Sequence, residues 1–136
     1  KELDSVIPDA DKLATDFPTT SYYSEVLADA LVHRAGATAG TAPDRAAADF
    51  ERVLKLTRQL VDRYGSQPDH IGLRGSAFLG KGRLLAATGK SAEAAAEFDK
   101  AVRTFQVAAD LDPDDFEHRR GLKEATAAAA ARPTKP

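Results

Sequence analysis

The side chains best suited to metal binding or acid–base catalysis in this sequence are three histidines, His33, His70 and His118. Histidine is a common zinc ligand and can exchange a proton near neutral pH. A zinc site needs three or four ligands that converge on one ion, and we expect no ligand partner three or four residues from these histidines. His70 and His118 are 48 residues apart, which matches the repeat described below. We therefore expect structural or surface roles for all three, and no metal site.

The acidic run from Asp110 to Asp115 raises the possibility of a calcium loop. Such a loop needs alternating oxygen ligands, a glycine at its sharp turn and a distal bidentate glutamate. Pro113 interrupts the run, and the glycine is missing. Helix capping explains the run better: Asp112 is predicted to cap a helix whose first turn contains Pro113.

No pattern typical of an enzyme is present. The sequence lacks a nucleophile elbow and a phosphate-binding loop, and Gly80-Lys81-Gly82 lies inside a predicted helix rather than after a strand. The absence of cysteine excludes disulfides, thiolate metal sites and cysteine nucleophiles. We predict no catalytic residue and no cofactor, and expect that the protein is not an enzyme.

The composition is that of a folded domain, with 136 residues, of which 43% are hydrophobic and 29% charged. A net charge of −2 gives no strong attraction to nucleic acid, and no apolar run reaches the roughly 20 residues that span a bilayer. We predict one domain over residues 1–131 and a tail or linker over 132–136. The compartment stays open, with the cytoplasm slightly favoured. Because methionine is absent, we expect a processed chain or a segment of a longer one.

One amphipathic helix pattern occurs three times. Apolar residues follow Phe50 at i+3, i+4, i+10, i+11 and i+14, which is one face of an α-helix. The same slots are filled 47 residues earlier, from Leu3, and 48 residues later, from Phe98. The sets are Leu3, Val6, Ile7, Leu13, Ala14, Phe17; Phe50, Val53, Leu54, Leu60, Val61, Tyr64; and Phe98, Ala101, Val102, Ala108, Ala109, with Leu111 one residue short of the last slot.

Turn and capping signals divide the chain into six predicted helices, and no alternating strand pattern is found. The helices are expected at about residues 2–17, 20–38, 43–64, 68–88, 91–111 and 113–131. Pro8 either kinks the first helix or delays its start to near Asp9. The predicted fold class is all-α.

The fourth predicted helix contains Gly72, Gly75, Gly80 and Gly82. Each glycine costs roughly 1 kcal/mol relative to alanine in a helix interior, so the helix needs an offset of about 4 kcal/mol. Close approach of a neighbouring helix supplies such an offset, because glycine has no Cβ. The next helix carries small residues around Phe98, and we predict a tightly packed antiparallel pair.

These two helices carry a residue pattern that resembles a tetratricopeptide repeat: Gly82, Leu84, Leu85, Gly89, Ala94, Phe98 and Ala101. Residues 13–18 and 82–94 are similar to a longer variant of the repeat, common in large bacterial proteins and often attached to serine/threonine protein kinases. The resemblance implies an α-α solenoid of about six antiparallel helices with a right-handed superhelix. Residues 35–44 depart from the pattern, because the turn there is longer and irregular.

The resemblance also implies a function. In this family the first helix of each hairpin lines a concave face that binds peptides, sometimes through basic residues that contact carboxylates. We predict a non-catalytic protein-interaction or scaffolding module within a larger bacterial protein, with a protein or peptide partner, no nucleic acid partner and no membrane insertion. The alternative is a structural spacer or a self-association unit whose end helices pair in a homodimer. The predicted groove for an acidic or C-terminal peptide comprises His33, Arg34, Arg74, Lys81, Arg83, Arg119 and Lys123, with Arg120 beside them.

Overall fold

The computed structural model describes residues 2–131, and all regular structure in this range is helical. The helices are α1 (Glu2–Asp16), α2 (Ser21–Thr38), α3 (Pro43–Tyr64), α4 (Pro68–Ala87), α5 (Ser91–Leu111) and α6 (Phe116–Ala130). Their ends lie within three residues of the predicted ones, so the prediction of an all-α chain with six helices is confirmed for this range. The predicted tail at 132–136 lies outside the described residues.

The ends of α4 follow directly from the sequence. Pro68 is the first residue of the helix, where a missing N–H costs nothing. At the other end Gly89 has a φ of 82°, its N–H donates to the carbonyl of Ala86 at 3.1 Å, and the N–H of Lys90 donates to that of Leu85 at 2.9 Å. This is a Schellman motif, and it confirms the predicted stop at this point.

The predicted start of α6 is wrong by three residues. α6 begins at Phe116, and its cap is Asp115, whose Oδ1 accepts the N–H of Glu117 at 2.8 Å. Asp112 instead ends α5, and Pro113 lies in the turn between the two helices. Several aspartates in a row offer alternative caps, and the spacing alone does not choose among them.

Helix α1 runs without a break through Pro8, so the alternative of a start near Asp9 is wrong. Proline lacks the N–H that would bond to the carbonyl four residues earlier, here that of Asp4. Because Pro8 lies within two turns of the helix start, the loss affects a single intrahelical hydrogen bond.

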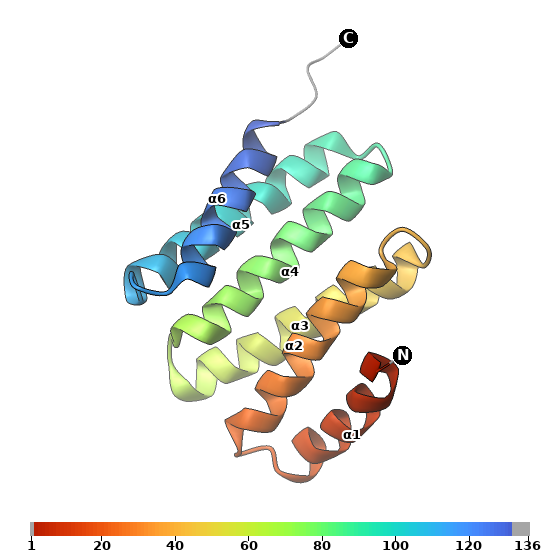
Figure 1. The fold of residues 1–136 in the computed structure, drawn as a ribbon, viewed down its shortest axis with the longest axis vertical. Helices are drawn as coiled ribbons and strands as arrows, with labels where there is room; N and C mark the ends of the chain where they lie inside the picture. Colours follow the sequence, from red (N-terminus) through yellow and green to blue (C-terminus); the bar gives the residue numbers. More distant parts are fainter. Residues whose placement is uncertain (1, 132–136) are drawn as a thin grey trace.

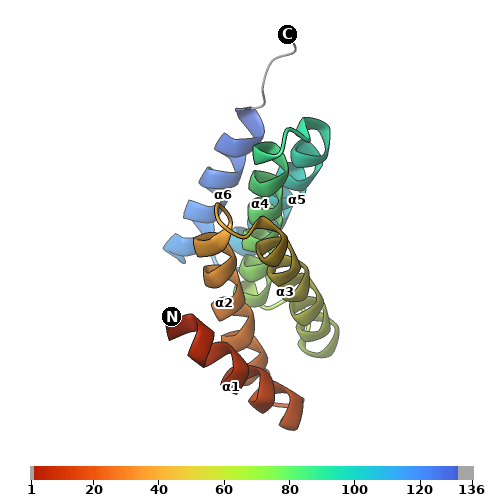
Figure 2. The ribbon, with the colours of Figure 1, turned by 90° about the vertical axis from the view of Figure 1, so that its right-hand side faces the viewer.

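The helices pack in chain order, each antiparallel to the one before it, as Figure 1 shows. In addition the backbone of α4 comes close to those of α2 and α6, whereas within residues 2–131 the backbones of α1 and α3, and of α3 and α5, do not come close to each other. Side chains still link α1 to α3, through the ion pairs Arg45–Asp4 at 3.3 Å and Arg52–Asp11 at 2.6 Å. In the view of Figure 2, α2 and α6 lie to the left of α3 and α5, with α4 between them. Together with the contacts of α4 to α2 and to α6, this arrangement places the even-numbered helices in one continuous row.

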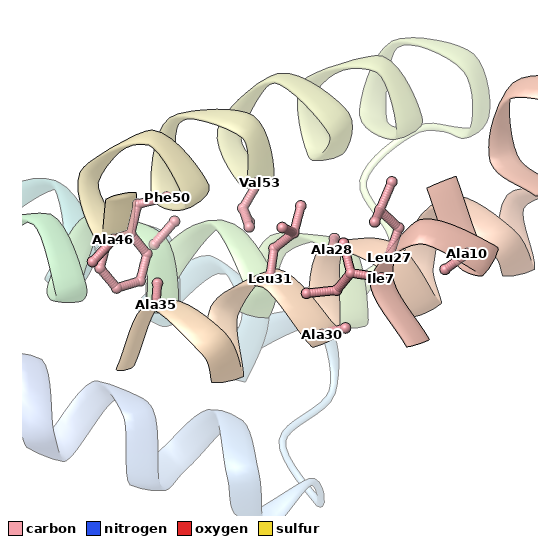
Figure 3. Close-up of a cluster of buried hydrophobic side chains, with 11 residues drawn as sticks. Ile7, Ala10, Leu27, Ala28, Ala30, Leu31, Ala35, Ala46, Phe50 and Val53 are labelled. Atoms are coloured by element: carbon pink, nitrogen blue, oxygen red, sulfur yellow. The ribbon is translucent and has the colours of Figure 1, made fainter. Parts of the chain in front are cut away.

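Two clusters of buried apolar side chains hold the helices together. The first is shown in Figure 3 and contains Ile7 from α1, Leu27 and Leu31 from α2, and Phe50 and Val53 from α3. Burial of each such large side chain stabilises the fold by about 1.5–3 kcal/mol. The second cluster joins α4, α5 and α6 through Leu79, Ala94, Phe98, Ala101, Phe105 and Ala125. Helix α4 contributes to both clusters, with Ala77 in the first and Leu79 in the second, and so connects α1–α3 to α5 and α6.

Aromatic rings rest on the glycines of α4. A Cβ at Gly80 would lie 2.1 Å from Cζ of Phe50, and a Cβ at Gly82 would lie 2.5 Å from Cε1 of Phe98. The glycines thus make room for a neighbour, as predicted, but that neighbour is a phenyl ring, and the expected approach of a helix backbone is wrong at Gly80 and Gly82. The buried ring area offsets the low helix propensity of glycine.

Candidate functional site

A groove with a volume of about 920 Å³ runs between α2, α4 and α6, and we name it the central groove. Almost all of its lining residues come from these three helices. Helices α3 and α5 contribute Phe50 and Phe105, whose rings lie against Gly80 and Gly121. The glycines thus let rings from the outer helices form part of an apolar floor.

Carboxylates outnumber cations in the central groove, with five carboxylates and two arginines among its lining residues. The guanidinium of Arg120 lies 3.4 Å from a carboxylate oxygen of Glu117 and 3.6 Å from one of Glu124, so these acids neutralise it. Arg83 has no ion-pair partner among residues 2–131. The groove is therefore acidic. Its carboxylates are Glu25, Asp29, Asp69, Glu117 and Glu124.

The seven predicted groove residues do not gather on one surface. His33 and Arg83 line the central groove. Lys123 is exposed on α6 but lies outside the groove, and Arg119 donates a hydrogen bond to the carbonyl of Pro113 at 3.3 Å. The remaining three are held between helices by the contacts described next: Arg34, Arg74 and Lys81.

Arg34 is the centre of an ion cluster that joins α1, α2 and α3. Its Nε and Nη2 donate to Oδ2 and Oδ1 of Asp49 at 2.8 and 2.9 Å, and its Nη1 lies 3.5 Å from Oδ1 of Asp4. The side chain of Asp49 is 8% exposed. The hydrogen bond to Asp49 is the main reason that the pKa of Arg34 is raised, and it outweighs the opposite effect of burial. Arg34 therefore serves to hold these three helices together.

Lys81 is the centre of a second cluster, which joins α3, α4 and α5. Its Nζ lies 2.7 Å from Oε2 of Glu51 and 3.6 Å from Oε1 of Glu97. Burial, the largest single effect, lowers the pKa of Lys81, but the hydrogen bonds and charges of Glu51 and Glu97 together raise it above the ordinary value of 10.5. Lys81 is therefore also held inside the helix stack.

The two clusters use corresponding positions of the sequence. Arg34 and Lys81 are 47 residues apart, and so are Asp4 and Glu51. Asp49 and Glu97 are 48 residues apart. The first cluster, Asp4–Arg34–Asp49, therefore corresponds residue by residue to the second, Glu51–Lys81–Glu97.

Arg74 points toward α3. Its Nη1 donates to the carbonyl of Leu54 at 2.9 Å and to Oγ1 of Thr57 at 3.2 Å, and its guanidinium carbon lies 5.5 Å from the ring centroid of Phe78. Burial is the main cause that lowers the pKa of Arg74. Its contacts fix the α3–α4 pair, and it is not available to a ligand in the groove.

Two histidines are buried near the start of α4 and of α6. Nε2 of His70 lies 2.9 Å from Oε2 of Glu25. Nε2 of His118 lies 3.5 Å from Oδ1 of Asp69 and 3.7 Å from Oδ2 of Asp115. Asp115 is three residues before His118, so the expectation that no histidine has a ligand partner at such a spacing is wrong.

The acids of the central groove were also missed, although part of the signal is in the sequence. Glu25, Asp29 and His33 follow each other at intervals of four residues and so share one face of α2. The predicted groove included His33 from this face but not its acidic neighbours. The facing acids of α6 could be added only once the fold placed α6 opposite α2 across α4.

Within residues 2–131 no helix combines the length and the apolar character needed to cross a bilayer. No family model, curated protein or solved structure matches the chain.

Proposed function

We propose that residues 2–131 form a tetratricopeptide-like α-α solenoid that acts as a non-catalytic protein-interaction or scaffolding module. The main support is the central groove: α2, α4 and α6 contact one another in turn and line it together. In a stack of helix pairs, a small rotation from each pair to the next curves the stack, and the inner helices then line a concave surface. Such surfaces are where solenoid proteins bind partners.

The paired ion clusters give independent support for a repeat. An acid–base–acid arrangement recurs at the 47–48 residue interval at which the apolar helix pattern recurs. Each cluster joins three consecutive helices, and so it links one helix pair to the helix that precedes it. A repeating contact of this kind is expected where each unit is stabilised mainly by its neighbours.

The charge of the central groove favours a basic partner segment. Five carboxylates line it, and the one lining arginine without an ion-pair partner among residues 2–131 is Arg83. Opposite charge steers association and adds specificity. The apolar floor, with Phe50 and Phe105, suits a large apolar side chain as an anchor. We therefore replace the acidic peptide expected from the sequence with a lysine- or arginine-rich segment, because most of the predicted basic residues are engaged elsewhere.

Fluorescence anisotropy with a labelled amphipathic peptide of lysine and leucine tests this proposal. The triple variant Asp29→Asn, Glu117→Gln, Glu124→Gln removes groove charge without touching the buried histidines. We expect it to weaken binding by about tenfold, since three partly screened charge contacts are lost. Binding by the wild type should also weaken as salt rises.

The matched control is Asp44→Asn, Asp62→Asn, Glu93→Gln, which removes three exposed acids of α3 and α5 that lie outside the groove. This control keeps the net charge equal to that of the groove variant and should bind like the wild type. Equal weakening in both triple variants, or equal affinity for a glutamate–leucine peptide, rejects the groove as the basic-peptide site.

Self-association is the second candidate, because both ends of the stack expose apolar side chains. Leu13 is 37% and Phe17 50% exposed at the α1 end, and Leu111 is 47% and Phe116 61% exposed where α5 meets α6. End-to-end contact between two copies would cover these groups. Sedimentation velocity should then show a dimer that Phe17→Ser and Phe116→Ser together abolish. A monomer up to high concentration excludes this candidate.

A further inference from the structure

Three side chains meet where the starts of α4 and α6 face each other. Asp69 lies in the first turn of α4, Asp115 caps α6, and His118 lies in the first turn of α6. One ligand atom from each lies within 4.8 Å of the other two. The group thus combines a nitrogen and two oxygens from two helices.

His118 points to a ligand at this position. Its side chain is 7% exposed, and its buried Nε2 has no hydrogen-bond partner among residues 2–131. The distances of 3.5 Å to Asp69 and 3.7 Å to Asp115 exceed the 2.7–3.2 Å of an ordinary N–H···O bond. Four ligands at about 2.0–2.2 Å from a zinc ion lie about 3.3–3.6 Å from one another. The separations therefore match ligands that share an ion better than direct hydrogen bonds.

The surrounding contacts orient these ligand atoms. Oδ1 of Asp115 accepts the N–H of Glu117 at 2.8 Å, which leaves Oδ2 on the side of His118. The ring of His118 lies against Gly72, where a Cβ would come within 2.8 Å of Cε1. Gly72 therefore leaves the space that the ring of His118 occupies. The carboxylate of Asp115 is held by its hydrogen bond to the backbone, as ligands in metal sites commonly are.

We infer that Asp69, Asp115 and His118 bind a divalent transition-metal ion, with Zn²⁺ as the best fit. Imidazole suits zinc and its neighbours in the first transition row, whereas Ca²⁺ and Mg²⁺ take oxygen ligands. The side chain of Asp69 is 78% exposed, and Asp69 and His118 both line the central groove. The remaining coordination positions thus face solvent and the groove. The ion would fasten α6 to α4 and offer an open position to water or to a bound partner.

His70 provides an internal control, because it occupies the corresponding position 48 residues earlier and is equally buried, at 4% exposure. Its Nε2 lies 2.9 Å from Oε2 of Glu25, which is an ordinary hydrogen bond. Its buried Nδ1 also has no hydrogen-bond partner among residues 2–131, so the two histidines differ in the carboxylates around them and not in this respect. The part of the chain that the structure describes contains no second cluster of three such ligands. His70 should therefore not bind an ion.

Isothermal titration of the tag-free chain with ZnCl₂ alone tests the inference. We expect one Zn²⁺ per chain. His118→Asn should weaken binding by about 100-fold or more, because loss of a direct ligand costs at least as much as loss of a supporting contact. His70→Asn should leave it unchanged. Substitution with Co²⁺ should give visible d–d absorption that His118→Asn abolishes, which reports direct coordination.

Two further variants keep the test decisive if His118→Asn unfolds the chain. Asp115→Asn retains a good helix cap while it removes the ligand charge, and Asp69→Asn changes an exposed side chain. Each should weaken zinc binding by about tenfold or more with the circular dichroism spectrum unchanged. Absence of 1:1 binding, or binding that none of these three substitutions alters, would overturn the inference. The outcome does not depend on the basic-peptide proposal, whose triple variant spares all three ligands.

Discussion

The Arg34 cluster and the Lys81 cluster occupy corresponding positions but differ in how well they satisfy their charged groups. Arg34 makes two hydrogen bonds to the buried carboxylate of Asp49. Lys81 makes one close contact, to Glu51, and lies 3.6 Å from Glu97, whose buried Oε1 has no hydrogen-bond partner among residues 2–131. Equivalent sequence positions therefore do not imply equivalent energies.

The difference follows from the chemistry of the two cations. A guanidinium presents a planar fork that matches both oxygens of a carboxylate, whereas an ammonium is a point charge on a flexible stem. The fork can satisfy Asp49 completely and still approach Asp4. We expect the first cluster to contribute more to stability, and the predictions below test that ranking.

Breaking the first cluster should have the largest effect. Asp49→Ala leaves the partly buried guanidinium of Arg34 without its main partner, and we expect a loss of about 3 kcal/mol in the free energy of unfolding. Glu97→Ala should cost about 1 kcal/mol, because Lys81 keeps its contact with Glu51. Urea unfolding followed by circular dichroism measures both.

The cation swap is the control for this ranking. Arg34→Lys should lose part of the stability that Asp49→Ala loses, because it keeps the charge but not the fork. Equal costs for Asp49→Ala and Glu97→Ala would show that the geometry of the cation does not matter here, and the contrast between the clusters would fail.

Glycines on α2 and α4 give the next contrast. Gly80→Ala places a Cβ against the buried ring of Phe50 and should destabilise the protein by about 1–3 kcal/mol. Gly36→Ala meets nothing within 4 Å and should stabilise it by about 0.5–1 kcal/mol, because alanine favours the helix. Thermal unfolding of both variants decides the sign. A stabilising Gly80→Ala would contradict the packing described for α4.

The sequence predicted the helices well because their signals are local. The amphipathic spacing around Phe50 and the stop at Gly89 are each contained within a few turns of chain. Side-chain partners between helices are not local. Whether Arg34 lines a groove or pairs with Asp49 depends on the angle at which α2 and α3 pack, and residue types do not state that angle.

The same limit applies to the candidate sites. Asp115 could have been linked to His118 by its spacing of three residues, but Asp69 joins them only because α4 and α6 start at the same end of the molecule. The acidity of the groove depends on α2, α4 and α6 sharing one face. Sequence periodicity gives the helices, and the contacts between every second helix give the sites.

High pH should lower the stability that the second cluster contributes but not that of the first, and this is the smallest of the predicted effects. The pKa of Lys81 is raised in the folded state above 10.5, so its contribution to stability is complete below that pH and is lost as pH rises through the folded value. Arg34, whose pKa is raised above its ordinary value by the hydrogen bond to Asp49, stays charged over this range. Between about pH 9 and about pH 11.5 the melting temperature of the wild type should therefore fall more steeply than that of Lys81→Arg, a protein that differs from it at this residue alone. Parallel curves for the two proteins would mean that the ammonium of Lys81 adds nothing to the stability of the second cluster.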